Sequence, residues 1–123
     1  LEGVWVLCDR YTDASVAYQG YGKKININKI QNLIDQFTGN IAPDLTIFFD
    51  LPHNLAKKRF PKNKIKDRFE NLDNNFFDDV YNGYQKQAIK YKDRIKVVDA
   101  RVSKEEVYGQ IINIIDKKFN NII

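Results

Sequence analysis

Three short apolar runs, each followed directly by an aspartate, constrain the fold of this chain more than any other feature. The runs cover residues 4–8, 45–49 and 95–98, and the acids that follow them are Asp9, Asp50 and Asp99. Runs of this length and composition are typical of strands buried in a parallel sheet. Because helical patterns lie between them, right-handed strand–helix–strand units are predicted. We therefore expect one α/β domain over residues 1–123, without an internal boundary.

Four helices are predicted between and after these runs from their start and stop signals. The first covers residues 28–37, and the second opens at Pro52 and runs toward the next basic pair. Asp73 or Asn74 can cap a long third helix, and a capping box beginning at Ser103 opens the last one. We expect one face of each helix to be buried. In the first and last helices these faces consist of Ile30, Leu33, Ile34 and Phe37, and of Val107, Ile111, Ile114 and Ile115.

Composition narrows the class of protein without deciding it. The net charge of +4 fits an anionic ligand, and nucleic acid, a phosphorylated small molecule and an acidic membrane all remain open. No apolar stretch approaches the ~20 residues that a membrane span needs, and no signal-peptide pattern is visible. The single cysteine, Cys8, has no partner within the chain, which favours a buried thiol in a reducing cytoplasm.

The residues directly after the first run carry the strongest functional signal. Ligands of open α/β sheets bind beyond the carboxyl ends of the strands, so Asp9 and Arg10 fall where a ligand is expected. An arginine there can bind a phosphate through two hydrogen bonds, and an aspartate can hold Mg²⁺ directly or through water. A structural ion pair between the two residues is the alternative.

Two other features are ambiguous on residue type alone. The basic stretch between Phe60 and Asn71 is interrupted by Pro61, and it is either a solvated connection, which composition favours, or a lid. His53 has no cysteine, histidine or paired carboxylate at ligand spacing, so we expect a surface residue there.

Several motifs, in the same order along the chain, resemble those of thymidylate (dTMP) kinases. The most specific one joins an Asp-Arg-Tyr element to an Ala-Tyr-Gln-Gly element, and the others support it. The resemblance covers essentially the whole chain. The motifs are Asp9-Arg10-Tyr11 with Ser15 and Ala17-Tyr18-Gln19-Gly20, Pro43-Asp44-Leu45-Thr46, Phe49-Asp50-Leu51, Lys58-Arg59, Asp67-Arg68-Phe69-Glu70, and Val98-Asp99-Ala100.

The resemblance implies a role for each residue of the first motif. Arg10 would bind the 5′-phosphate of dTMP in line with the ATP γ-phosphate, and Asp9 would organise Mg²⁺ through water. Ser15 and Gln19 would hydrogen-bond the thymine edge. Tyr18 would pack against the sugar and leave no room for a 2′-hydroxyl. Alignment and charge neutralisation are what phosphoryl transfer chiefly requires.

The resemblance also implies an ATP side, of which this chain carries only a part. Arg68 would be a catalytic lid residue over the ATP phosphates, with the lid at about residues 60–71, and Arg59 would lie near the adenine. The chain contains no G-x-x-x-x-G-K-[ST] motif, no methionine, and begins at Leu1. We therefore expect the later part of a P-loop-type, three-layer α/β/α kinase, inactive alone because it lacks the ATP phosphate loop.

The expected protein is thus a cytoplasmic enzyme that uses Mg²⁺ and ATP to phosphorylate dTMP and forms a homodimer when complete. Neither a membrane nor a nucleic acid is expected as a partner. Two alternatives remain open. One is a related nucleoside or nucleotide kinase with another base preference. The other is a non-catalytic, kinase-derived basic binding module.

Overall fold

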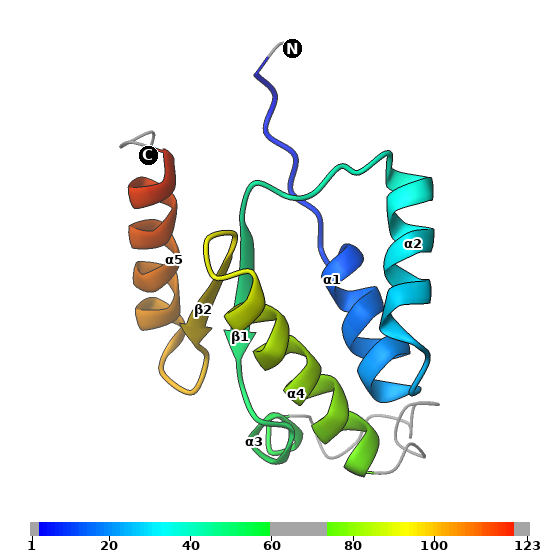
Figure 1. Cartoon of the computed structure of the whole chain (residues 1–123). Helices are drawn as coiled ribbons and strands as arrows, with labels where there is room; N and C mark the ends of the chain where they lie inside the picture. The colour runs from blue at the N-terminus through cyan, green and yellow to red at the C-terminus, as the bar shows by residue number, and fades with distance from the viewer. Residues whose placement is uncertain (1–2, 60–73, 120–123) are drawn as a thin grey trace.

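The computed structural model describes residues 3–59 and 74–119, which form an α/β arrangement around a small parallel sheet (Figure 1). Along the chain, most of the helices either precede the first strand or lie between the two strands. The elements are α1 (Thr12–Ser15), the π-helix η1 (Val16–Gly22), α2 (Ile27–Thr38), β1 (Thr46–Asp50), α3 (His53–Lys57), α4 (Asn74–Lys90), β2 (Ile95–Asp99) and α5 (Lys104–Phe119).

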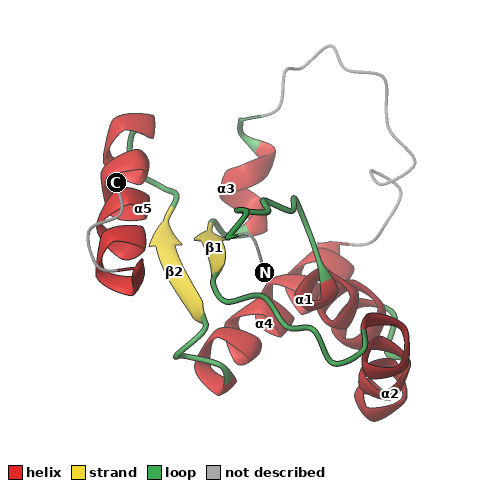
Figure 2. Cartoon of the chain, turned by 90° about the horizontal axis from the view of Figure 1, so that it is seen from above, coloured by secondary structure: helices red, strands yellow, loops and turns green. Residues whose placement is uncertain are grey.

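The two strands pair in parallel, as the apolar runs predict. Their register runs from Thr46 opposite Ile95 to Asp50 opposite Asp99, so both carboxyl ends meet at one edge of the sheet. Seen from above, the strands lie between α5 on one side and α1 and α4 on the other (Figure 2). The α/β class and the arrangement of helices on both sides of a parallel sheet are therefore confirmed.

The core lies where η1 packs on α4 and α4 packs on β2. Val98 and Ala17 have no exposed surface, and Val80 and Ile95 are almost as deeply buried. The two helices approach closely because glycine occupies the contact: a Cβ on Gly83 would lie 2.7 Å from the Tyr21 ring. Such a distance leaves no room for a side chain, so the packing of η1 on α4 depends on this glycine.

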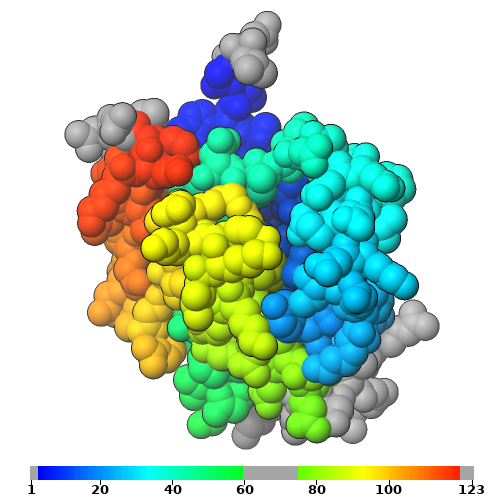
Figure 3. Space-filling view, in the orientation of Figure 1, coloured from blue at the N-terminus to red at the C-terminus, as the bar shows by residue number. Residues whose placement is uncertain are grey.

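The predicted first strand is not present. Residues 4–8, called the arm below, run without helix or strand structure, and Val4, Val6 and Leu7 are 76%, 83% and 94% exposed. The arm stands out from the body of the molecule (Figure 3). Cys8 is exposed as well, contrary to the expected core position. A strand needs a neighbour for its backbone N–H and C=O groups, and within the described residues β1 and β2 pair only with each other.

The helix termini follow their sequence signals more closely than the buried faces do. The Asn26 side chain accepts a hydrogen bond from Lys29 N–H at the start of α2, and Gly39 ends this helix with φ +60°. On the predicted buried face, however, only Ile30 is buried, whereas Leu33 and Phe37 are 54% and 87% exposed. The prediction for that face was wrong because no described element covers its outer part.

At α5 the capping box is confirmed and the burial is partial. Ser103 Oγ accepts from the Glu106 N–H at 3.2 Å, and the Glu106 carboxylate accepts from the Ser103 N–H at 3.0 Å. The predicted apolar stripe of α5 is half-buried, and no residue of this helix is fully buried. Among the helices of residues 3–59 and 74–119, none has both the length and the apolar character needed to cross a bilayer.

Candidate active site

The turn at residues 8–11 presents the candidate phosphate ligand. Arg10 is exposed and has φ +64°, a left-handed backbone conformation that is uncommon for a residue with a side chain. The Cys8 thiol lies 3.7 Å from the Arg10 carbonyl, to which it donates. Ala14 N–H then donates to the Tyr11 carbonyl at 3.1 Å, where α1 begins. Strained conformations of this kind persist only where the surrounding structure holds them, and they are frequent at functional sites.

A π-helix follows α1 and carries Tyr18 and Gln19. The Lys23 N–H donates to the Tyr18 carbonyl at 3.0 Å, five residues back along the chain, which is the π-type hydrogen bond. Sequence analysis did not foresee this element. π-Helical turns are rare and often occur at functional sites. The position of η1 at the predicted nucleotide-binding residues agrees with this tendency.

Arg10 lies on an aromatic cluster that connects the turn to the sheet. Its guanidinium carbon is 4.3 Å from the centroid of the Tyr18 ring, a cation–π contact. Tyr84 of α4 stacks on Phe48 of β1, with ring centroids 5.2 Å apart and planes at 13°. Burial, and then the proximity of Tyr18, raise the pKa of Tyr84 to about 12, while Arg10 opposes this shift. Arg10 therefore has an exposed face toward solvent and an aromatic face toward the fold.

The carboxyl ends of the two strands carry the acids predicted there. Asp99 accepts from the Arg101 side chain at 2.8 and 2.9 Å and from its backbone N–H, and these hydrogen bonds lower the pKa of Asp99 to about 2. Asp99 thereby caps the loop that follows β2. Asp50 instead accepts from Tyr81 Oη at 2.6 Å and from Gln85 Nε2 at 3.0 Å, both on α4.

The remaining predicted site residues are distributed as follows. Asp9, Ser15 and Gln19 are exposed. Arg59 lies near the loop after β2, where its Nη2 donates to the Arg101 carbonyl at 3.3 Å. Arg68 and the proposed lid, residues 60–71, lie outside the described residues.

The two charged side chains of the turn, Asp9 and Arg10, do not form an ion pair with each other. Among the described residues, ion pairs join Lys24 to Asp79, Arg94 to Asp13 and Arg101 to Asp99, and none joins Asp9 to Arg10. The structural ion pair considered for Asp9 and Arg10 is thus absent. In the same part of the chain, no three His, Cys, Asp or Glu side chains are grouped as metal ligands.

His53 is more enclosed than sequence analysis predicts. Its ring stacks on Phe77, with centroids 4.3 Å apart and planes at 13°, and the residue is half-buried. Burial, followed by the charge of Lys57, lowers the pKa of His53, and Asp78 opposes this shift. The surface position expected for His53 was therefore wrong.

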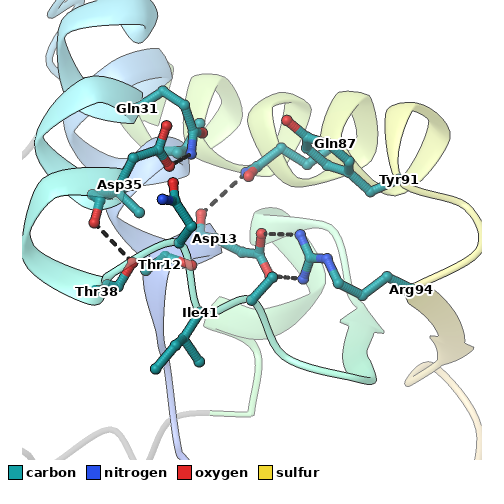
Figure 4. Close-up of a pocket in the computed structure, with 13 residues that line it drawn as sticks. Thr12, Asp13, Gln31, Asp35, Thr38, Ile41, Gln87, Tyr91 and Arg94 are labelled. Carbon is teal, nitrogen blue, oxygen red and sulfur yellow. Dashed lines mark hydrogen bonds and ion pairs between the residues drawn. The ribbon is translucent and has the colours of Figure 1, made fainter.

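Sequence reasoning also missed a charged cluster behind the turn. Asp13 of α1 forms an ion pair with Arg94, which precedes β2, beside a pocket of about 250 Å³ between α1, α2 and α4 (Figure 4). The two residues are separated by 81 positions, so no local pattern connects them.

The parallel sheet with helices on both sides defines an α/β protein. Comparison with known proteins then gives the family. The family model for thymidylate kinase matches residues 1–111. The chain belongs to the thymidylate kinase family, in agreement with the resemblance of its motifs, and this family has a P-loop NTPase-type fold.

Individual relatives agree with this assignment. The chain is 36% identical over 115 residues to a thymidylate kinase of Nitrosomonas eutropha, an alignment that covers 94% of the chain and 54% of the relative. It is 40% identical over 113 residues to one of a Psychrobacter species, with 89% and 54% covered. It is 41% identical over 99 residues to one of Alkalilimnicola ehrlichii, with 80% and 46% covered. The chain spans about half the length of the curated relatives it matches.

Proposed function

We propose that this chain is the dTMP-binding and lid portion of a thymidylate kinase that transfers a phosphoryl group from ATP to dTMP and forms dTDP. The observation that carries the proposal is the exposed guanidinium of Arg10, which forms no ion pair with another described residue and is held over Tyr18 at the end of the turn. The membership of the family supports the same activity. The activity is that of the full-length protein containing this chain.

In the proposed mechanism, Arg10 binds the 5′-phosphate of dTMP through two parallel hydrogen bonds and neutralises charge that is shared among the phosphate oxygens. The cation–π contact restricts the guanidinium to one side of the turn, so less rotational freedom is lost on binding. Tyr18 packs against the deoxyribose, and Ser15 and Gln19, both exposed, hydrogen-bond the thymine edge. A site with such polar partners rejects bases that leave them unpaired.

Magnesium and ATP complete the proposed reaction. Mg²⁺ usually keeps several waters and binds one or two carboxylates together with substrate phosphates. A single exposed carboxylate beside Arg10 fits this behaviour, and Asp9 would hold the ion through water. When bound, the ion neutralises phosphate charge. Arg59 would contact the adenine and Arg68 the ATP phosphates. We propose that the 123-residue chain alone is inactive, because it contains no P-loop motif.

We further propose that the full-length enzyme is a cytoplasmic homodimer that associates through its helices. The exposed apolar side chains of Leu33 and Phe37 on α2 support a contact of this kind. In sedimentation analysis of the full-length protein, Phe37→Glu should convert dimer to monomer, and an unchanged dimer would exclude this face.

Thermal stabilisation and turnover with a panel of nucleotides test which substrate the protein uses. The full-length protein should be stabilised against heat by dTMP, and dTMP with Mg·ATP should yield dTDP. Stabilisation by dCMP or dGMP but not by dTMP would favour the related kinase with another base preference. Salt-sensitive binding to DNA or RNA, without any nucleotide kinase activity, would favour a basic binding module.

The substitution Arg10→Ala tests the role of the guanidinium. We expect kcat/KM for dTMP to fall about 10²- to 10³-fold, as when other preorganised charge-stabilising donors are removed. The melting temperature should not change, because Arg10 is exposed. Lys90→Ala is a matched control, since Lys90 is also exposed and lies 5.0 Å from the centroid of the Tyr91 ring. An Arg10→Ala enzyme as active as the control would remove Arg10 from the phosphate site.

A further inference from the structure

We propose that Asp13 and Arg94 form a positioning clamp that fixes α1, and through it the Arg10 turn and Tyr18, for binding of dTMP. The inference rests on the proposed function and names residues for which neither the motifs nor the family assignment supplies a role. Neither Asp13 nor Arg94 touches the nucleotide in this account. They act through the backbone that carries the residues that do.

The clamp is a two-pronged ion pair with a third member. Arg94 Nη1 and Nη2 donate to the two carboxylate oxygens of Asp13 at 2.7 and 2.8 Å. The Thr46 hydroxyl donates to Asp13 Oδ2 at 3.0 Å and lies 2.8 Å from Arg94 Nη1. The side chains of Asp13 and Arg94 are only 10% and 20% exposed. Parallel hydrogen bonds between guanidinium and carboxylate fix orientation as well as distance.

The clamp ties α1 to three other elements. Arg94 directly precedes β2, and Thr46 is the first residue of β1. Gln87 of α4 donates from Nε2 to the Asp13 backbone carbonyl at 3.1 Å (Figure 4). Thr46 N–H also donates to the Arg94 carbonyl at 3.0 Å, so the two residues that hold the Asp13 carboxylate are hydrogen-bonded through their backbones as well. Asp13 is therefore held through both its side chain and its backbone.

The location of the clamp explains why it would matter for the nucleotide. Every described residue from Gly3 to Tyr11 is exposed, and Asp13 is the first buried residue along the chain. The Arg10 turn thus has little packing of its own, and it keeps a left-handed backbone conformation at Arg10. Its nearest buried attachment is Asp13. On the other side of Asp13, the same short helix leads into the π-helix with Tyr18.

The electrostatics of the pair favour a rigid attachment. The hydrogen bonds from Arg94 to Asp13 raise the pKa of Arg94 further above its already high ordinary value, so the guanidinium stays charged. In a partly buried site, the removal of one partner leaves the other charge without compensation. A lysine at position 94 keeps the charge but loses the planar fork that sets the angle of α1. Charge and geometry can therefore be separated by substitution.

The test uses steady-state kinetics of the full-length protein with Asp13→Asn, Arg94→Lys and Thr46→Val. We expect Asp13→Asn to raise the KM for dTMP about 10- to 100-fold, the range seen when groups that orient binding residues are changed. The KM for ATP should stay unchanged. Arg94→Lys and Thr46→Val should raise the KM for dTMP less, in that order.

The exposed ion pair between Lys24 and Asp79 supplies the control, since it also joins the end of the η1 region to α4. Lys24→Met should leave both KM values unchanged. All assays are run well below each variant's melting temperature, and if Asp13→Asn does not fold, Arg94→Lys and Thr46→Val decide the matter.

The outcomes separate the two proposals. A wild-type protein that does not phosphorylate dTMP contradicts the proposed function itself. An active wild type with an unchanged KM for dTMP in the folded clamp variants contradicts the clamp alone. A parallel rise in the KM for ATP and for dTMP would make the cluster a general structural element and would also overturn the inference.

Discussion

The arm and β1 are similar in sequence and opposite in structure. Both are short apolar segments that end in an aspartate, Asp9 after the arm and Asp50 at the end of β1. β1 pairs in register with β2, and its Phe48 stacks on Tyr84. The arm pairs with no strand among the described residues, Leu7 is 94% exposed, and the ring contact of the arm is the edge-on approach of Trp5 to Phe119 of α5, with ring centroids 4.9 Å apart. Apolar composition gives a segment the capacity to form a strand, but paired backbone groups and a covering helix decide whether it does so.

We therefore expect the sheet and the arm to have different roles. The sheet is buried and holds the fold, so substitutions there should reduce the free energy of unfolding. The arm leads to the Arg10 turn and contributes little packing, so substitutions near it should change binding more than stability. The following predictions for the 123-residue chain test this division, beginning with the largest expected effect.

Val98→Asp in β2 should have the largest effect on stability. Val98 has no exposed surface, so the new carboxylate would be buried without a partner. We expect a loss of at least about 4 kcal/mol in the free energy of unfolding, measured by urea titration with circular dichroism. Val97→Asp is the matched control, because Val97 is next to Val98 in the same strand and is 46% exposed. Equal losses for both variants would contradict the described orientation of β2.

Phe48→Ala should rank second. Its ring stacks on Tyr84 at 5.2 Å and lies 6.4 Å from Tyr81, but the residue is half-buried. We expect a loss of about 2 kcal/mol, less than the cost of removing a fully buried phenylalanine. Phe49→Ala, at a position that is 51% exposed, should cost about half as much. A larger loss for Phe49→Ala would mean that the other face of β1 is the packed one.

Tyr84 should make stability depend on pH in the alkaline range. Its pKa in the folded protein is about 12, above the ordinary value of 10.0, so the folded state keeps a proton that the unfolded state loses. The stabilisation is complete below pH 10 and is lost as the pH rises toward 12, by about 1–2 kcal/mol after allowing for solvent screening. Over this range the urea midpoint of wild type should fall relative to that of Tyr84→Phe. A constant difference would show that the Tyr84 hydroxyl is not buried in the folded protein.

Leu7→Ser in the arm should have the smallest effect. The side chain is 94% exposed, so we expect a change below about 0.5 kcal/mol in the same urea titration. A loss comparable to that of Phe48→Ala would show that the arm is packed against the fold, and the distinction between the two regions would then fail.

The features that sequence analysis predicted correctly are local or periodic. Gly39 ends α2 because its backbone can adopt positive φ, and Ser103 with Glu106 opens α5 through a short-range capping box. The parallel pairing of β1 with β2 follows from their apolar runs and the helical patterns around them. In the site, Arg10 is exposed, and its role as a phosphate ligand stays a prediction.

The features that were missed depend on contacts distant in sequence. The π-helix is packed on α4, where Gly83 receives the Tyr21 ring, and no pattern within residues 16–22 indicates this. The pairing of Asp13 with Arg94 needs the folded sheet to bring α1 beside β2. The arm was assigned to a strand because it is a short apolar run like β1, whereas the absence of a pairing strand beside it among the described residues cannot be read from composition.

The central claim is that Arg10 binds the phosphate of dTMP, and a crystal structure of the full-length protein with dTMP tests it most directly. The account predicts two guanidinium nitrogens of Arg10 within about 2.7–3.2 Å of phosphate oxygens, with the sugar against the Tyr18 ring. A nucleotide bound elsewhere, with Arg10 turned away from its phosphate, would contradict the account.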